Sequence, residues 1–221
     1  MESYIKLRQV SYAYPKGRFS LHDVSLNLNQ GEITVVKGLN GSGKTTLGKI
    51  IMGILIPSTG TIEIDGVDSN KLKLCHRGSK IGYAFQNPDR QLFTASVFEE
   101  ITFPLEIKGM SKKAADQKAT MLLEKFDLAH LKQRIPMRLS RGEKQRLVLA
   151  SILAQEPGYL ILDEPSTGLD RDRRRELYDL LETLTREGIG MAIISHDLQF
   201  AENYANRIIT MAEGQVIIDG L

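Results

Sequence analysis

Apolar and polar residues follow several different periods along the chain. Three early segments, YIKLRQVSYAY, LHDVSLNL and TIEIDG, are β-rich, and the last of them alternates as a half-buried strand does. A fourth, EITVVKG, becomes continuously apolar, which is typical of a strand buried on both faces. The first part of the chain is therefore predicted to combine an antiparallel β subdomain with a buried core strand.

The period changes to that of a helix at Lys44. Apolar residues at spacings i, i+3, i+4 and i+7 form one predicted helical face: Leu47, Ile50, Ile51 and Ile54. Pro57 is expected to end this helix.

Residues 87–139 are predicted to be mostly helical. Ser111 is a candidate N-cap. The helix that it opens has an apolar stripe of Ala115, Ala119, Leu122 and Phe126. Four further apolar residues of this region are assigned to its core: Leu92, Phe93, Phe98 and Phe103.

The chain after Ser140 alternates between helices and strands. YLILD and GMAIIS are continuous apolar runs of strand length, separated by the helix predicted after Asp170. This order indicates βαβ crossovers and a parallel sheet covered on both faces. The final segment, RIITMAEGQVIID, predicts a hairpin that turns at Glu213 and Gly214.

Composition excludes several classes of protein. The 221 residues are 42% hydrophobic and 25% charged, and the net charge of +2 gives no overall field for a nucleic-acid partner. A single cysteine, Cys75, allows no intrachain disulfide and is consistent with the cytosol. MESYIKLRQV lacks the apolar centre of a signal peptide, and IIMGILI is too short to span a bilayer. Any membrane role is therefore expected to depend on a partner.

The stretch RLSRGEKQRLVLA has two interpretations. Ser140 and Glu143 have the spacing of a helix capping box. A helix start also offers free N–H groups and a positive dipole end, which bind phosphate in many proteins. The residues alone leave both interpretations open.

Residues 38–45, GLNGSGKT, match the phosphate-binding pattern GxxxxGK[ST] between a predicted strand and a predicted helix. Backbone N–H groups of such a loop turn inward around an anion, Lys44 neutralises the β and γ phosphates, and Thr45 offers a hydroxyl to Mg²⁺. The predicted nucleotide-binding residues here are Gly38, Leu39, Asn40, Gly41, Ser42, Gly43, Lys44, Thr45 and Thr46.

The segment YLILDEP places two carboxylates at the end of a buried strand. Asp163 is expected to hold Mg²⁺, and Glu164 to act as general base or to orient water. An acidic pair after a strand can also serve only as a helix cap. The phosphate loop favours the catalytic interpretation.

Taken in chain order, these motifs resemble those of a known family. Tyr14, GLNGSGKT, Gln86 in AFQNPDRQLF, LSRGEKQR, YLILDEP, STGLD and SHD resemble the ATP-binding subunit of ATP-binding cassette (ABC) transporters over essentially the whole chain. FQNPDRQLF is similar to the cobalt/nickel and energy-coupling-factor vitamin importers.

The resemblance implies a role for several isolated residues. Tyr14 matches the aromatic residue that stacks on adenine, with Tyr12 as an alternative. Gln86 matches the glutamine that touches Mg²⁺ or the attacking water, and His196 the histidine that contacts the γ phosphate. Asp170 matches an acidic residue that crosses between subunits.

The resemblance also implies that LSRGE contacts a second subunit. The family usually has LSGGQ here, and Ser140 with the Gly142 backbone is expected to address ATP bound by a second subunit. Arg141 and Glu143 depart from that pattern. One hypothesis is that the Arg141 guanidinium offsets the charge of Glu143 beside the γ phosphate.

These observations predict an α/β P-loop NTPase fold: a parallel sheet flanked by helices, an N-terminal antiparallel β subdomain and a helical insertion. The whole chain, 1–221, is predicted to form one ABC domain, with residues 1–86 and 140–221 as nucleotide-binding core and 87–139 as helical subdomain. The predicted function is ATP hydrolysis by a dimer with Mg²⁺, at the cytoplasmic face of the membrane. It would drive uptake of a vitamin or transition-metal ion through transmembrane partners docked on the helical subdomain.

Three alternatives to this function remain. They are a non-catalytic regulatory cassette, a soluble ABC ATPase without a transport role, and a small-molecule kinase. Glu164 and His196 argue against the regulator. The soluble ATPases usually carry two cassettes or a long coiled-coil insertion, and a kinase would not need LSRGE or STGLD.

Overall fold

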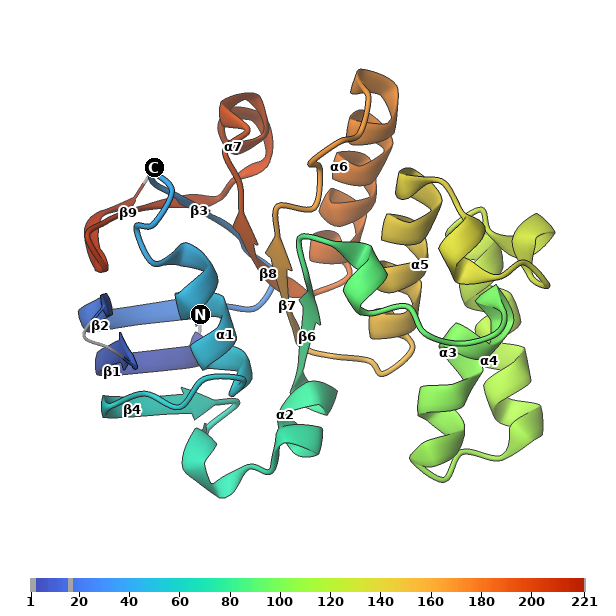
Figure 1. Ribbon diagram of the computed structural model, residues 1–221, viewed down its shortest axis with the longest axis horizontal. Helices are drawn as coiled ribbons and strands as arrows, with labels where there is room; N and C mark the ends of the chain where they lie inside the picture. Colours follow the sequence, from blue (N-terminus) through green and yellow to red (C-terminus); the bar gives the residue numbers. More distant parts are fainter. Residues whose placement is uncertain (1–2, 16–17, 221) are drawn as a thin grey trace. The chain divides into compact units, whose positions relative to one another are not determined.

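The computed structural model describes residues 3–15 and 18–220. The chain forms two compact units. The first unit comprises Met1–Tyr83, Pro157–Pro165 and Tyr178–Leu221, and the second comprises Ala84–Glu156 and Ser166–Leu177. Figure 1 shows the elements of both units, coloured along the chain.

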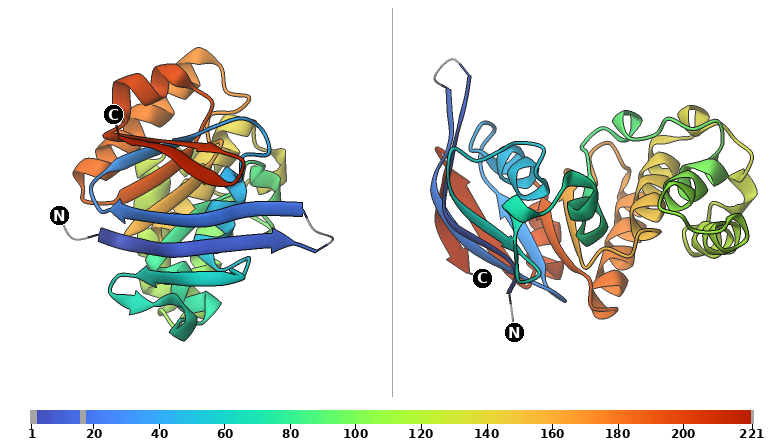
Figure 2. Two further views of the ribbon diagram at one scale, coloured as in Figure 1. Left: turned by 90° about the vertical axis from the view of Figure 1, so that its left-hand side faces the viewer. Right: turned by 90° about the horizontal axis from the view of Figure 1, so that it is seen from below.

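The first unit contains a four-stranded antiparallel sheet with the order β2-β1-β4-β5. Its strands are β1 (Ser3–Tyr14), β2 (Arg18–Asn29), β4 (Thr59–Ile64) and β5 (Val67–Asp68). The long strands β1, β2 and β4 lie side by side in Figure 2, left. This sheet is the antiparallel β subdomain that the early alternating segments predict.

A six-stranded sheet has the order β10-β9-β3-β8-β7-β6. Its strands are β3 (Ile33–Lys37), β6 (Ile81–Ala84), β7 (Tyr159–Asp163), β8 (Gly190–Ile194), β9 (Arg207–Ala212) and β10 (Gln215–Gly220). Strand β3 pairs in parallel with β8 and β9, and β8 pairs in parallel with β7. Every residue of β7 and β8 is buried, as their continuous apolar sequences predict.

The hairpin at the end of this sheet is confirmed. Strand β10 runs antiparallel to β9, and the two residues between them, Glu213 and Gly214, have φ values of 47° and 78°. Two consecutive positive φ values are the mark of a tight hairpin turn.

Helix α1 (Lys44–Met52) packs against side chains of both sheets. Leu47 and Ile51 line a small internal void together with Leu26 of β2 and Ile161 of β7. The unit also contains α2 (Leu74–Lys80), α7 (Leu198–Tyr204) and a 3₁₀ turn at Ser69–Lys71. The loop after β3 therefore leads into a helix that packs against both sheets.

The predicted end of α1 is wrong. The helix stops at Met52 because Gly53 has the left-handed value φ 85°, and its N–H caps the carbonyls of Ile50 and Lys49. Ile54, expected on the buried face, is 43% exposed. Pro57 lies beyond the point where glycine has already ended the helix.

The second unit is built mainly of helices: α3 (Val97–Ile107), α4 (Lys112–Lys125), α5 (Arg141–Leu153) and 3₁₀ turns at Pro88–Arg90, Ala129–Leu131 and Pro136–Arg138. Helix α3 packs against α4 and α5, as Figure 1 shows. The first residues of α6 (Arg171–Arg186) belong to this unit and the remainder to the first unit. The helical content predicted for 87–139 is confirmed.

The N-cap predicted for α4 is confirmed, and the buried face predicted for this helix is confirmed except at one residue. The Ser111 hydroxyl accepts the Ala114 N–H at 3.4 Å, so the predicted N-cap is confirmed. Ala115, Ala119 and Phe126 are buried, but Leu123 replaces Leu122 on the buried face.

Two of the four apolar residues assigned to the core of 87–139 lie at the surface instead. Leu92 is buried as predicted and Phe98 is half-buried. Phe93 is 69% exposed and Phe103 is 44% exposed. Their rings pack edge to face against each other, with centroids 5.8 Å apart, so they contact one another rather than entering the core.

Candidate active site

The phosphate-binding pattern forms the loop between β3 and α1 in the first unit. Gly43, the residue before α1, has φ 103°, and a Cβ there would lie 2.6 Å from the Ser20 carbonyl oxygen. No other residue fits this position without moving the β2 backbone. The loop therefore delivers the start of α1, with its free N–H groups, to the edge of the parallel sheet.

Lys44 is buried inside the loop that precedes it. Its Nζ donates to the carbonyl oxygens of Gly38 at 2.8 Å and Leu39 at 2.9 Å. Burial lowers the pKa of its ammonium group, and the nearby carboxylates of Glu164 and Asp163 act in the opposite direction. The cation is thus held among carbonyls and carboxylates, at the point where the loop can enclose an anion.

Thr45 and Asp163 meet across the sheet edge. The Thr45 hydroxyl donates to Asp163 at 3.0 Å, although the two residues are 118 positions apart in sequence. Burial raises the pKa of Asp163, against the effects of the Thr45 hydroxyl and Lys49. A hydroxyl and a carboxylate in contact are oxygen ligands that suit Mg²⁺, and a bound cation would favour the ionised carboxylate.

Glu164 has an unusual backbone conformation. Its φ is 51°, in the left-handed region that a residue with a side chain rarely occupies. Its N–H donates to the Ile194 carbonyl at 2.9 Å, and its Oε1 lies 3.3 Å from His196 Nε2. Such strain at the end of a strand is typical of functional positions. The structure therefore brings Glu164 and His196 together, from the ends of β7 and β8.

Tyr14 is linked to the residue after Thr45. Its phenol oxygen lies 3.2 Å from the Thr46 hydroxyl, which also accepts from Ser20 at 2.9 Å. Tyr12 packs edge to face on Tyr14, with ring centroids 4.9 Å apart. Of the two tyrosines, Tyr14 is the one bonded to the start of α1.

Within the phosphate loop, Ser42 and Thr46 are buried, whereas Leu39, Asn40 and Gly41 are exposed. The tip of the loop is therefore open to a ligand while its base is packed.

The remaining predicted site residues, Gln86, Ser140, Arg141, Gly142, Glu143 and Asp170, belong to the second unit. Gln86 is exposed after β6. Asp170 accepts the Arg173 N–H at 2.8 Å and caps α6.

The capping box at the start of α5 is confirmed. The Ser140 N–H donates to Glu143 Oε2 at 2.7 Å, and the Glu143 N–H donates to the Ser140 hydroxyl at 3.4 Å. The hydrogen bonds with Ser140 lower the pKa of Glu143. Arg146 and Arg134 lower it further. The carboxylate is thus turned onto the start of its own helix.

Two residues that the motifs do not contain also contact the site. Ser20 donates to Thr46, and the buried Tyr83 hydroxyl lies 3.5 Å from Asp163 Oδ2. Neither belongs to a pattern with chemical meaning in a single sequence, so only the folded structure reveals them.

An anion loop with a buried lysine in the first helical turn, beside a hydroxyl and carboxylate pair suited to magnesium, defines the class of P-loop nucleoside triphosphatases. Comparison with known proteins identifies a family within this class. A family model described as ABC transporter matches residues 21–167. The chain belongs to the ABC transporter ATPase family.

Relatives include a putative ABC transporter ATP-binding protein of Methanosarcina acetivorans, 40% identical over 98% of this chain and 35% of its own length. The energy-coupling factor transporter ATP-binding protein EcfA of Methanothermobacter thermautotrophicus is 38% identical over 98% of this chain and 70% of the relative. This chain thus spans about a third of the first relative.

Solved structures share the fold. CbiO1 of Clostridium perfringens, described as part of the ABC transporter complex cbiONQ, has a TM-score of 0.91 and 34% identity, covering 100% of this chain and 89% of that one. MJ0796, a dimeric ATP-binding cassette in a post-hydrolysis state bound to ADP and Pi, has a TM-score of 0.88 and 30% identity, with 97% of each chain covered. The α/β fold predicted from the sequence is confirmed. None of the helices in the described residues has the length and apolar character needed to cross a bilayer.

Proposed function

We propose that this chain hydrolyses ATP to ADP and phosphate at the site of its first unit. Lys44 and the backbone N–H groups of residues 38–45 bind the β and γ phosphates, and Tyr14 stacks on adenine. Thr45 and Asp163 hold Mg²⁺, with Gln86 as a further ligand, and the ion supplies charge neutralisation for the phosphates.

Glu164 is the general base or the group that orients the attacking water. The observation that supports this role most strongly is the position of its carboxylate, 3.3 Å from His196 Nε2, at the residue that follows Asp163. A carboxylate beside the γ phosphate can accept the proton of water during attack. His196 contacts the γ phosphate and orients Glu164.

A second ABC ATPase subunit, identical or related, completes the site. Ser140, the Gly142 backbone and the start of α5 address the nucleotide of the other subunit, with Arg141, Glu143 and Asp170 beside them. The dimer described for MJ0796 supports this arrangement. Binding of ATP closes the dimer, and hydrolysis removes the shared charge and allows the halves to separate.

The chain acts at the cytoplasmic face of the membrane, bound to transmembrane subunits. It drives import of a vitamin or a transition-metal ion. Support comes from two relatives, an energy-coupling factor transporter ATP-binding protein and a protein described as part of the ABC transporter complex cbiONQ.

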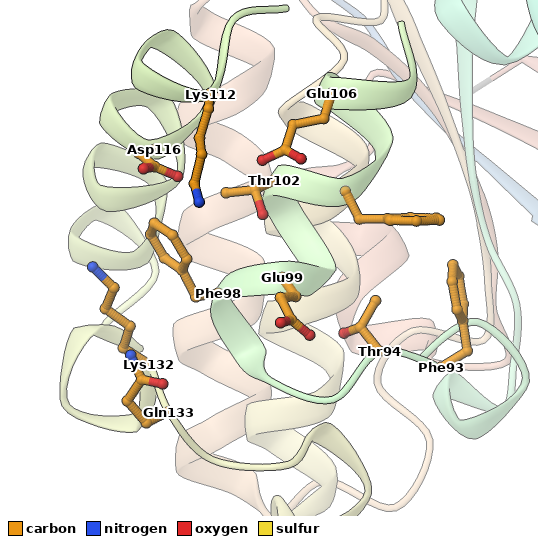
Figure 3. Close-up of a pocket in the computed structure, with 11 residues that line it drawn as sticks. Phe93, Thr94, Phe98, Glu99, Thr102, Glu106, Lys112, Asp116, Lys132 and Gln133 are labelled. Atoms are coloured by element: carbon orange, nitrogen blue, oxygen red, sulfur yellow. The ribbon is translucent and has the colours of Figure 1, made fainter.

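The partner docks on a groove of about 730 Å³ in the second unit, shown in Figure 3. The aromatic side chains of Phe93, Phe98 and Phe103 line it, and Lys132 Nζ lies 3.9 Å from the centroid of the Phe98 ring. Three carboxylates and two lysines give the lining one net negative charge: Glu99, Glu106 and Asp116 against Lys112 and Lys132. Charge complementarity favours a partner segment with apolar side chains and a basic group.

The substitution Glu164→Gln tests the proposed chemistry. It keeps the shape of the side chain but removes the base, so we expect ATP turnover to fall by about 10²- to 10⁴-fold. ATP should then hold the protein as a stable dimer, measured by size-exclusion chromatography with light scattering. The matched control Glu202→Gln, on the exposed face of α7, should hydrolyse ATP normally. Unchanged turnover in E164Q would instead indicate a regulatory cassette.

A further inference from the structure

Arg141, the residue that replaces a glycine of the usual family pattern, lies across Gly168. A Cβ built on Gly168 would be 2.9 Å from Arg141 Nε and 3.0 Å from both Cδ and Cζ. Gly168 has φ 77°, which also favours glycine. The side chain of the first residue of α5 is therefore in contact with bare backbone in the loop 166–170, STGLD.

The next residue of the helix also lies near the loop. A Cβ built on Gly142 would lie 3.7 Å from Leu169 Cδ2, which is ordinary van der Waals distance. Two consecutive residues at the start of α5 thus face two consecutive residues of the loop.

The rest of the loop is held by its own hydrogen bonds. The Leu169 N–H donates to the Ser166 carbonyl at 3.2 Å, and Arg174 Nη2 donates to the Leu169 carbonyl at 3.3 Å. Asp170 is engaged by the N–H of Arg173. Gly168 lies in the middle of this turn, where the Arg141 side chain covers it.

Glu143 is held by contacts at the start of its own helix. The carboxylate of Glu143 accepts the Ser140 N–H, and the cations that lower its pKa are Arg146 and Arg134. The planar guanidinium of Arg141 packs against the loop at Gly168.

We propose that Arg141 is a positioning residue that clamps the loop 166–170 onto the start of α5. The consequence for catalysis rests on the proposed function: α5 and Asp170 then approach the nucleotide of the second subunit as one rigid piece. A glycine at position 141 would leave the two segments to be ordered separately, at an entropic cost when the dimer closes.

The clamp itself is tested in the isolated chain by hydrogen exchange. In R141A the Leu169 amide, bonded inside the loop, should exchange about three- to tenfold faster because the turn opens more often. R138A removes an equal charge two residues before Ser140 and should leave this amide unchanged. R141K keeps the charge without the planar group and should behave as R141A does. Equal protection of Leu169 in R141A and the native chain would overturn the proposal, and full rescue by lysine would show that charge, not packing, acts here.

The catalytic consequence is tested in the E164Q background. R141A should raise the ATP concentration needed for dimerisation by about tenfold, while ATP affinity of the separate subunit stays the same, because binding in the first unit does not use Arg141. In the same assay, G168A should raise the ATP concentration needed for dimerisation more in a chain with Arg141 than in R141A, because the added Cβ meets the guanidinium. Strict additivity of the two substitutions would contradict the contact. If E164Q dimerises neither with itself nor with a related ABC ATPase subunit, the proposed function fails, and the exchange of Leu169 still decides the clamp.

Discussion

At the scale of single residues, Glu143, which differs from the usual family pattern, stabilises the start of its own helix. Its carboxylate accepts the Ser140 N–H at 2.7 Å and thereby caps the helix that begins at Arg141. A negative charge at this end also interacts favourably with the helix dipole. Both interpretations of RLSRGEKQRLVLA can hold in one molecule, with the cap present in the single chain and the phosphate contact proposed for the dimer.

The pKa of Glu143 tests this cap. Its hydrogen bonds to Ser140 lower the pKa below the ordinary 4.5, so NMR titration of the side-chain carboxyl should give a midpoint under that value. Ser140→Ala should move the midpoint upward, whereas Ser79→Ala, at a half-buried serine of α2, should not. Because the folded-state pKa is depressed, the stabilisation by this cap is complete above the unfolded-state pKa. It is lost as the pH falls through the folded value. A midpoint at or above 4.5 in the native chain would contradict the cap.

At the scale of elements, a buried carboxylate organises the start of α3. Glu100 is buried, and its Oε2 accepts the N–H groups of Phe93 and Thr94 at 3.1 Å and the Thr94 hydroxyl at 2.8 Å. These bonds hold the segment before the helix in a turn. This turn holds Phe93 at the groove of Figure 3, because the N–H of Phe93 donates to Glu100.

Glu100→Ala should therefore destabilise the second unit. Three donors lose their acceptor, which costs about 1–3 kcal/mol where a buried donor is left unpaired. The measurement is the free energy of unfolding in urea, supported by faster exchange of the Phe93 and Thr94 amides. Glu99→Ala, the exposed neighbour, should have a much smaller effect. Equal stability of the two variants would contradict the role of Glu100.

At the scale of the whole molecule, two residue pairs of the proposed catalytic site and the groove proposed for docking belong to different units. The Thr45 and Asp163 pair and the Glu164 and His196 pair all lie in the first unit, whereas the groove lies in the second. The exposed Phe93 and Phe103 belong to the class of aromatic residues that anchor protein interfaces.

The double substitution F93A/F103A tests the groove. Binding to washed membranes of the source cells, measured by sedimentation, should weaken about tenfold or more, because aromatic anchors carry a large share of interface free energy. Leu74→Ala, which removes another exposed apolar residue, should bind as the native chain does. ATP binding without membranes should be the same in all three proteins. Undiminished membrane binding of F93A/F103A would exclude the groove as the docking surface.

Some features follow from short stretches of sequence alone. The capping box at Ser140, the N-cap at Ser111 and the hairpin turn at Glu213 were all predictable, since each depends on hydrogen bonds or φ values within a few residues. The buried strand YLILD was equally predictable, because a continuous apolar run of that length has few alternatives. The phosphate loop was also predictable, because the glycines and the lysine that bind an anion lie together in one short segment.

Only the tertiary structure decided which distant residues meet and which face of an element is covered. The Thr45 to Asp163 bond joins positions 118 residues apart, and Ser20 and Tyr83 reach the site without any motif. Phe93 looked like a core residue but is exposed, because burial depends on neighbours that sequence spacing does not specify. Local hydrogen bonding is encoded at short range, whereas packing across sheets and helices is settled only when the whole chain has folded.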